Sequence, residues 1–364
     1  MNDLLAQLID DRPLSIDQAI EAFDQIMAGR VNVAQMAAVL ALIQRRGATI
    51  DEITGAATVM RRRVTPVTVP DHLTVIDTCG TGGDHASTFN ISTAAAIVAA
   101  ASGRPRNVAV AKHGNRAVTS KSGSSQVLET LGVKLRVTPQ TLTRCLDEAG
   151  LCFCFAPAHH PAMKHAAPVR ADLGFRTIFN LLGPLTNPAA ARRQIIGVFS
   201  ESLTEPIASV LQKLGTEQAM VVCGRHGSGT LDELSTTGPT RVSRLRQNRI
   251  ETSQIDPGSL GLAAAVPDDL KADGAERSAE IIRRILDGRK GAARDIVMLN
   301  TAAALVVADL AEGLDDGLKA AADAIDTGAA ASCLEKLVAL TQGEEEATER
   351  RSDKATKGGR GSDP

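Results

Sequence analysis

Hydrophobic residues recur every three or four positions through the first 65 residues, a spacing that places apolar side chains on one face of a helix. Two sets show it: Ile16, Ile20, Phe23 and Met27, followed by Met36, Val39, Leu40 and Ile43. Capping-box pairs mark three helix starts: Ser15 with Gln18, Asn32 with Gln35, and Thr49 with Glu52. We therefore predict three short helices. Pro66 and Pro70 end the helical pattern and mark a linker.

After the linker, short apolar runs alternate with stretches of helical spacing. The runs cover residues 73–76, 108–111, 151–155, 195–199 and 219–223. The helical stretches cover residues 91–101, 127–131, 139–149, 275–287 and 295–311, with shorter ones to about 341. This alternation is typical of α/β proteins. The predicted fold is a small all-helical N-terminal domain, residues 1–66, plus a larger α/β domain, residues 71–341, with a mainly parallel central sheet flanked by helices.

Two further segments differ in character from the rest. Residues 159–188 are helix-like, interrupted by prolines and rich in cations. Residues 343–364 combine high charge and glycine with no apolar side chain larger than alanine, so we predict a disordered tail.

Composition narrows the class of protein. With 364 residues, of which 43% are hydrophobic, the chain can bury a large core in more than one domain. Forty basic and 42 acidic residues give a net charge of -2, which does not indicate a nucleic-acid-binding surface. There is no apolar run long enough for a membrane span, and the N-terminus is acidic rather than signal-like. We expect a cytoplasmic protein with small-molecule partners.

The first candidate site is a turn of small residues after the run at 73–76. Residues 80–84 read GTGGD, and the glycines allow backbone N–H groups to approach a ligand closely. Asn90 is expected to cap the following helix, where Ser92 and Thr93 add hydroxyl groups. The pattern predicts a phosphate site. For this turn alone, an ordinary tight strand-to-helix turn is the alternative.

A second turn follows the run at 108–111. It reads KHGNR over residues 112–116, so Lys112 and Arg116 supply fixed positive charges. Hydroxyl residues come next: Thr119, Ser120, Ser122 and Ser124. Because ligands of open α/β sheets gather at the carboxyl ends of strands, we expect the two turns to share one ligand with several phosphate oxygens.

Together, GTGGD, TFNIST and KHGNRAVTSKSG resemble the signature of the anthranilate phosphoribosyltransferase family of tryptophan biosynthesis, and the resemblance covers residues 1–341. It implies transfer of the phosphoribosyl group of 5-phosphoribosyl 1-pyrophosphate to the amine of anthranilate, with release of pyrophosphate. It also implies a homodimer through the helical domain. The residues implied for phosphoribosyl pyrophosphate are Gly80, Thr81, Gly82, Gly83, Asp84, Thr88, Asn90, Ile91, Ser92, Thr93, Lys112, His113, Gly114, Asn115, Arg116, Ser120 and Ser124.

Adjacent carboxylates at Asp232 and Glu233 follow the run at 219–223. On residue type alone they fit a solvated loop or a Mg²⁺ site, since Mg²⁺ prefers oxygen ligands. The resemblance implies that they bind Mg²⁺ together with Ser92, and that two ions are held.

For the acceptor, the resemblance implies that residues 160–188 cross back to the helical domain and line an aromatic pocket. The implied anthranilate residues are Gly80, His113, Asn115, Ala156, Pro157, His160 and Arg170. A guanidinium suits a carboxylate, although Arg170 also fits a domain-bridging salt bridge, and the two histidines also fit structural roles. No general acid or base is predicted, because an aniline-type amine is neutral at pH 7 and attacks with its lone pair.

Two rival functions remain open. A pyrimidine nucleoside phosphorylase-like enzyme shares a similar second turn but is expected to be longer and to lack the Asp232–Glu233 pair. A non-catalytic relative that binds nucleic acid is expected to lose its metal ligands and to be basic. Two positions depart from the family pattern: His85, where a small residue is commoner, and Gln126, where an acidic residue is usual.

Overall fold

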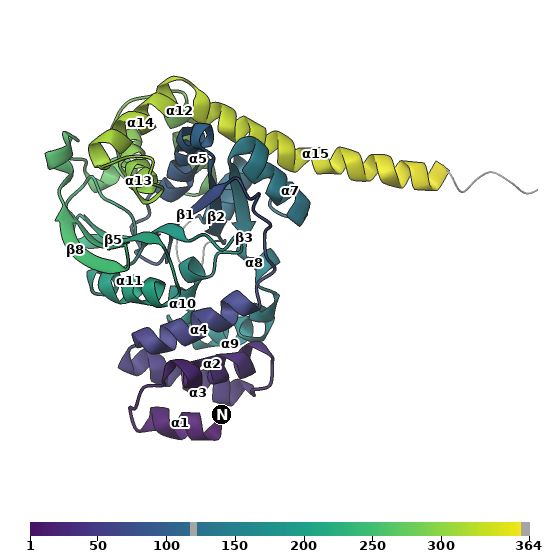
Figure 1. The fold of residues 1–364 in the computed structure, drawn as a ribbon, viewed down its shortest axis with the longest axis vertical. Helices are drawn as coiled ribbons and strands as arrows, with labels where there is room; N and C mark the ends of the chain where they lie inside the picture. The colour runs from purple at the N-terminus through teal and green to yellow at the C-terminus, as the bar shows by residue number, and fades with distance from the viewer. Residues whose placement is uncertain (117–121, 358–364) are drawn as a thin grey trace, which may run out of the picture.

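The computed structural model describes residues 1–116 and 122–357, with side chains described to residue 343. A helical layer lies at one end of a larger α/β body, and a long C-terminal helix projects from the opposite end (Figure 1). This arrangement confirms the predicted fold class. The helical layer begins with α1 (Asn2–Ile9), α2 (Ile16–Met27), α3 (Val33–Arg46) and α4 (Ile50–Arg62).

The first helix, α1, was not among the three predicted, because no capping side chain marks its start. The other three begin where the capping residues predict. Ser15 and Thr49 form complete capping boxes, whereas Asn32 only accepts a hydrogen bond from the Gln35 N–H. Glu52 has a second role, since its buried carboxylate also accepts from the Leu14 N–H and pairs with Arg46. A buried charge needs such partners to avoid a large desolvation penalty.

One eight-stranded sheet forms the centre of the α/β body. Its order is β3-β2-β1-β4-β5-β7-β8, with β6 beside β5. The strands are β1 (Thr74–Gly80), β2 (Val108–Gly114), β3 (Leu151–Phe155), β4 (Arg193–Gly197), β5 (Gln218–His226), β6 (Gly229–Leu231), β7 (Thr240–Arg246) and β8 (Arg249–Ile255). The first five pair in parallel, and β6, β7 and β8 are antiparallel. The five predicted strands are therefore present, and an antiparallel edge is added.

Helices cover both faces of this sheet. The α/β body contains α5 (Ile91–Gly103), α6 (Ser124–Thr130), α7 (Pro139–Arg144), α11 (Thr204–Lys213), α12 (Ala275–Leu286), α13 (Ala292–Val307), α14 (Leu314–Asp326) and α15 (Ala329–Lys357). Strand alternation directs side chains to two cores. Thus Ile195 packs in the core of α5 and α13, while Ile196 packs in a core shared with α11 and the helical layer.

The C-terminal segment differs from the predicted tail. The backbone of α15 continues as a helix to Lys357, whereas residues 358–364 lie outside the described part. Glutamate, alanine, arginine and lysine dominate this stretch, and all four favour helix on propensity even without a core to pack against. Low hydrophobicity in this stretch therefore does not prevent its backbone from adopting a helix as far as Lys357.

A crossing segment joins the two parts. It consists of α8 (Ala156–His159), a 3₁₀ turn (Pro161–His165), α9 (Ala167–Leu173) and α10 (Phe179–Leu182). The 3₁₀ turn packs on α2, α9 on α3, and α10 on α4, so this segment is a second wall of the helical layer (Figure 1). The sheet's carboxyl edge thus faces the crossing segment.

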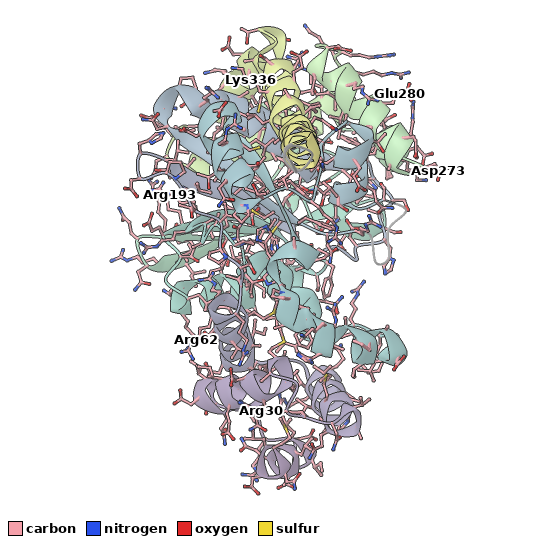
Figure 2. The ribbon with its side chains drawn as sticks, turned by 90° about the vertical axis from the view of Figure 1, so that its right-hand side faces the viewer. Arg30, Arg62, Arg193, Asp273, Glu280 and Lys336 are labelled. Carbon is pink, nitrogen blue, oxygen red and sulfur yellow. The ribbon has the colours of Figure 1, made fainter. Side chains whose placement is uncertain are left out.

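Charged side chains lie around the periphery of both parts, including Arg30, Arg62, Arg193 and Glu280 (Figure 2). Arg193 pairs with Asp309 at 2.6 Å and so joins β4 to the turn after α13. In the portion of the chain that the structure describes, no helix combines the length and apolarity needed to cross a membrane.

Candidate active site

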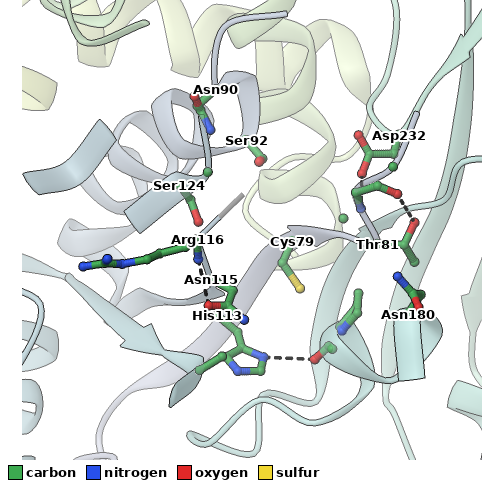
Figure 3. Close-up of a pocket in the computed structure, with 18 of the residues that line it drawn as sticks. Cys79, Thr81, Asn90, Ser92, His113, Asn115, Arg116, Ser124, Asn180 and Asp232 are labelled. Atoms are coloured by element: carbon green, nitrogen blue, oxygen red, sulfur yellow. Dashed lines mark hydrogen bonds between the residues drawn. The ribbon is translucent and has the colours of Figure 1, made fainter. Parts of the chain in front are cut away.

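A pocket of about 620 Å³ opens between the carboxyl edge of the sheet and the crossing segment. Its sheet side is formed by the turns after β1 and β2 and by Asp232 and Glu233, and its other side by residues of α8, α9 and α10. In Figure 3, Asp232 and Ser92 lie on one side of the pocket and His113 and Asn115 on the other. The two predicted turns therefore meet at one site.

The first turn depends on glycine for both space and conformation. A Cβ on Gly80 would lie 2.3 Å from Asp232 Oδ2, and Gly82 and Gly83 have φ values of +67° and +83°. The Gly82 N–H donates to Asp232 Oδ2 at 2.7 Å, so the turn and the carboxylate pair are in direct contact (Figure 3). A larger residue at Gly80 would displace Asp232.

The start of α5 differs from the prediction in one respect. Asn90 occupies the N-cap position but its side chain does not cap the helix. Its Oδ1 instead accepts hydrogen bonds from the hydroxyls of Ser122 at 3.1 Å and Ser278 at 2.9 Å. Asn90 therefore ties the first turn to residues near the second turn and to α12, which were not adjacent in any sequence pattern.

The second turn places a buried cation under the site. Lys112 is 3% exposed, and its Nζ donates to the Thr78 carbonyl at 2.7 Å. Nearby, the buried Asp77 carboxylate accepts from the His113 N–H at 3.2 Å and from Asn187 Nδ2 at 2.7 Å. These bonds join β1, β2 and the loop before β4, and they fix the position of Lys112 in the floor of the pocket.

Three carboxylates gather beside the glycine turn. Asp84 Oδ2 accepts from the Asp232 N–H at 3.2 Å, and Glu233 Oε1 accepts from the Ser92 N–H at 3.1 Å. Burial, then the charges of Asp84 and Glu233, raise the pKa of Asp232 well above its usual range. Burial raises the pKa of Glu233 to about 7, against the opposing effect of Lys112. Mutually repelling carboxylates of this kind are stabilised by a cation.

The donor set fits Mg²⁺, because carboxylate and hydroxyl oxygens are its preferred protein ligands. Among the residues that the structure describes, no three His, Cys, Asp or Glu side chains are arranged to hold a metal by themselves. Hydroxyl, water or substrate oxygens would therefore complete the coordination. That requirement is typical of Mg²⁺, which retains several waters.

His113 of β2 and His160 of the crossing segment form a buried pair where the two sides of the pocket meet. His113 Nδ1 is 2.9 Å from the Gly183 carbonyl, and the two Nε2 atoms are 3.1 Å apart. Burial lowers the pKa of His113 to about 3 and that of His160 to about 4, so both rings are neutral. Since the carbonyl can only accept, His113 donates from Nδ1 and accepts at Nε2 from His160. These hydrogen bonds hold both rings in fixed orientations, and the lowered pKa values make both imidazoles weak bases.

Arg170 lies on the acceptor side of the pocket, with its guanidinium carbon 5.4 Å from the ring centre of Phe179. Within the described residues it forms no ion pair with a carboxylate, and burial lowers its pKa. The predicted alternative of a domain-bridging salt bridge is therefore not what the structure shows. The surrounding wall is largely apolar, although Lys164 and Asn180 also line it; its apolar residues are Met60, Ala156, Pro157, Met163, Ala167 and Phe179. An unneutralised cation in an apolar wall suits a small aromatic acid.

Nearly all of the predicted site residues line this one pocket. Thr93 does not, because its side chain turns into the interior and is 1% exposed. Ser120 lies outside the described residues, as does Thr119. The sequence reading missed Arg176, Asn180 and Phe199 on the lining. For Arg176 and Asn180, the only indication in the sequence was that they lie in the cation-rich segment 159–188.

Known proteins resemble this chain along most of its length. Models of the "Glycosyl transferase family" match its helical bundle domain over residues 2–64 and its a/b domain over residues 72–331. The anthranilate phosphoribosyltransferase of Parvibaculum lavamentivorans is 49% identical, covering 93% of this chain and 97% of the relative, and that of Acetivibrio thermocellus is 48% identical, covering 93% and 95%.

Solved structures agree with these sequence matches. The crystal structure of anthranilate phosphoribosyltransferase from Thermus thermophilus has a TM-score of 0.86 at 40% identity, covering 93% of this chain and 99% of that one. The Saccharomyces cerevisiae enzyme in complex with PRPP and Mg has a TM-score of 0.83 at 26% identity, covering 94% and 97%. On fold, site and sequence, the chain belongs to the anthranilate phosphoribosyltransferases of this glycosyl transferase family.

Proposed function

We propose that this pocket transfers the phosphoribosyl group of 5-phosphoribosyl 1-pyrophosphate to anthranilate, with the residue roles given below. The supporting observation is the division of one cavity into two chemically different halves. One half has glycine N–H groups, Lys112 and the Asp232–Glu233 pair. The other has Arg170, which has no carboxylate partner among the described residues, in a largely apolar wall. The first suits a pyrophosphate and the second an aromatic carboxylate.

The chemistry consists of one displacement. The anthranilate nitrogen attacks C1 of the ribose, the bond from C1 to the pyrophosphate oxygen breaks, and pyrophosphate leaves with its electron pair. The nitrogen then loses a proton to water or to a pyrophosphate oxygen. The chain contributes position and charge: Arg170 orients the carboxylate, the glycine turn and Lys112 hold the leaving group, and the apolar wall excludes water. His113 and His160, with lowered pKa values, are too weak as bases to take that proton.

Asp232, Glu233 and Ser92 are the residues proposed to hold Mg²⁺, and two ions are proposed. When bound, the metal neutralises the charge that develops on pyrophosphate. The support is the raised pKa of both acidic side chains, which a nearby cation would reverse. The yeast relative is described in complex with PRPP and Mg.

Two whole-chain properties remain proposals. A homodimer through the helical layer is supported by the exposed apolar side chains of Ile9 on α1 and Val33 on α3. Light scattering of the purified chain would test it, and a monomer at micromolar concentration would contradict it. The cytoplasmic location remains the prediction made from the sequence.

Anthranilate fluorescence tests the function directly. With phosphoribosyl pyrophosphate and Mg²⁺, the protein should consume anthranilate, and chelation of the metal should stop the reaction. The rival function is tested in parallel with pyrimidine nucleosides and inorganic phosphate. Release of free base without any loss of anthranilate would replace the proposed activity with that of a nucleoside phosphorylase.

A further inference from the structure

Arg176 joins the two halves of the pocket. It lies in the short link between α9 and α10, and its guanidinium carbon is 4.2 Å from the ring centre of Phe199, two residues beyond β4. Its Nη2 donates to the Gly83 carbonyl and lies 3.1 Å from His85 Nε2. Among described residues it has no carboxylate partner. The Arg176 guanidinium is therefore bound to the backbone of the glycine turn and not to a carboxylate.

We propose that Arg176 is a positioning residue of the phosphate turn and that His85 acts through it; the inference rests on the proposed function. We call this contact set, made of Arg176, Gly83 and His85, the Arg176 bridge. The peptide unit is planar and trans, so a hydrogen bond that holds the Gly83 carbonyl also fixes the direction of the Asp84 N–H. The bridge thereby orients the turn without touching the reacting atoms.

The effect reaches the carboxylates through Asp84. Asp84 Oδ1 accepts from the Ala86 N–H at 3.1 Å, and its Oδ2 accepts from the Asp232 N–H at 3.2 Å. A rotation of the Gly83–Asp84 peptide would therefore disturb both the turn and the start of the Asp232–Glu233 pair. The space beside Gly83 is already filled, because a Cβ there would lie 3.2 Å from Arg176 Nη2.

His85 is the part of the bridge that departs from the family pattern. It is exposed, and its φ of +58° lies in the left-handed region, which a non-glycine residue adopts only when its surroundings hold it there. Its imidazole nitrogen accepts a hydrogen bond from Arg176, the observed contact that can hold it. In this chain, therefore, an extra side chain supports the turn from outside the pocket.

The bridge also connects donor and acceptor binding. Arg176 is six residues after Arg170 and three before Phe179, both on the acceptor wall. Movement of the crossing segment would be transmitted to the Gly83 carbonyl through one side chain. Donor binding and acceptor binding should therefore be coupled, and by linkage each substrate should change the affinity for the other by the same factor.

The test compares steady-state kinetics of Arg176→Met, His85→Ala and the double variant. Loss of a charge-assisted hydrogen bond should raise the KM for phosphoribosyl pyrophosphate about tenfold in Arg176→Met, with a smaller change in kcat. His85→Ala alone should raise this KM about threefold. In the Arg176→Met background, His85→Ala should have no further effect, because its partner is gone.

Arg277→Met is a matched control, since that arginine pairs with Glu280 on α12 outside the pocket. A donor KM within twofold of wild type in Arg176→Met, at unchanged melting temperature, would overturn the proposal. If the KM increases of the two single variants multiplied in the double variant, the proposal that His85 acts through Arg176 would be overturned. Because His85 is exposed, its variant keeps the test decisive if Arg176→Met fails to fold. Absence of turnover in the wild type would count against the proposed function instead.

Discussion

Arg170 carries a charge that the described part of the protein leaves without a carboxylate partner. Burial opposes that charge, as the lowered pKa shows, so the side chain gains when an anion binds beside it. A guanidinium can donate two parallel hydrogen bonds to one carboxylate, which fixes the plane of an aromatic acid as well as its position.

Replacement of Arg170 should therefore affect one substrate. Arg170→Ala is expected to raise the KM for anthranilate by about thirtyfold, the loss of a bidentate charged contact, while the donor KM stays near the wild-type value. Arg170→Lys keeps the charge but lacks the planar guanidinium, so its KM for anthranilate should lie between those of the wild type and Arg170→Ala. Initial-rate measurements with each substrate varied would check this. Equal effects on both substrates would contradict the assignment.

Glu233 provides a second prediction, on stability. Its pKa is raised from 4.5 to about 7, so the folded protein binds this proton more tightly than the unfolded chain. The stabilisation is complete below pH 4.5 and is lost as the pH rises through 7. His113 and His160 have lowered pKa values, so their contribution has the opposite sign over about the same range.

Thermal unfolding in EDTA from pH 5 to 7.5 reports on Glu233 together with Asp232, whose raised pKa depends in part on the charge of Glu233. Both histidines are retained in Glu233→Gln. As the pH rises, the melting temperature of the wild type should therefore fall relative to that of Glu233→Gln. Mg²⁺ should reduce that loss, because it binds the ionised carboxylate and not the protonated one. Parallel curves for the two proteins would show that Glu233 does not titrate in this range.

At the scale of elements, the parallel strands were predictable and the antiparallel edge was not. β1 to β5 are short apolar runs buried on both faces, a pattern that periodicity detects. β8 is exposed along most of its length, with charged and polar residues that suggest a loop. Its clearest signal is the turn at Gln247 and Asn248, both with positive φ, as in a two-residue hairpin turn.

The site was predictable to a similar degree and for a similar reason. Gly80 to Asp84 and Lys112 to Arg116 are local motifs, so the sequence displays them directly. Arg176 acts on Gly83 across 93 residues, and Asn90 bonds Ser278 across 188. Such contacts depend on how the crossing segment and α12 pack on the sheet, which no local pattern contains.

Gly197 shows how closely the elements at this edge approach one another. It ends β4, and a Cβ there would lie 1.5 Å from the Asp232 carbonyl oxygen. Gly197→Ala should therefore lower the free energy of unfolding by about 1–3 kcal/mol, as overpacking does, and should weaken Mg²⁺ dependence by moving Asp232. Chemical denaturation would measure it. Gly313→Ala, where the added methyl meets nothing within 4 Å, is the control, and equal stability of the two variants would contradict the packing argument.

At the scale of the whole molecule, the pocket exists only because the chain returns to its first domain. The crossing segment leaves β3, packs against α2, α3 and α4, and re-enters the sheet at β4. The residues proposed for the donor thus belong mainly to the sheet edge, whereas Ala156, Pro157, His160 and Arg170, proposed for the acceptor, belong to the crossing segment. A relative movement of the two parts would change the distance between the substrates, so the fold itself, without a separate lid, would bring them together.

The central claim is that Asp232 and Glu233 bind the metal that serves the pyrophosphate half of this pocket. The measurement is the rate of anthranilate consumption over a Mg²⁺ titration, for the wild type and for the double variant Asp232→Asn with Glu233→Gln. We predict that the double variant loses about a hundredfold in rate at limiting Mg²⁺ and recovers part of it at high Mg²⁺. A double variant with the wild-type rate and the wild-type Mg²⁺ dependence would contradict the account.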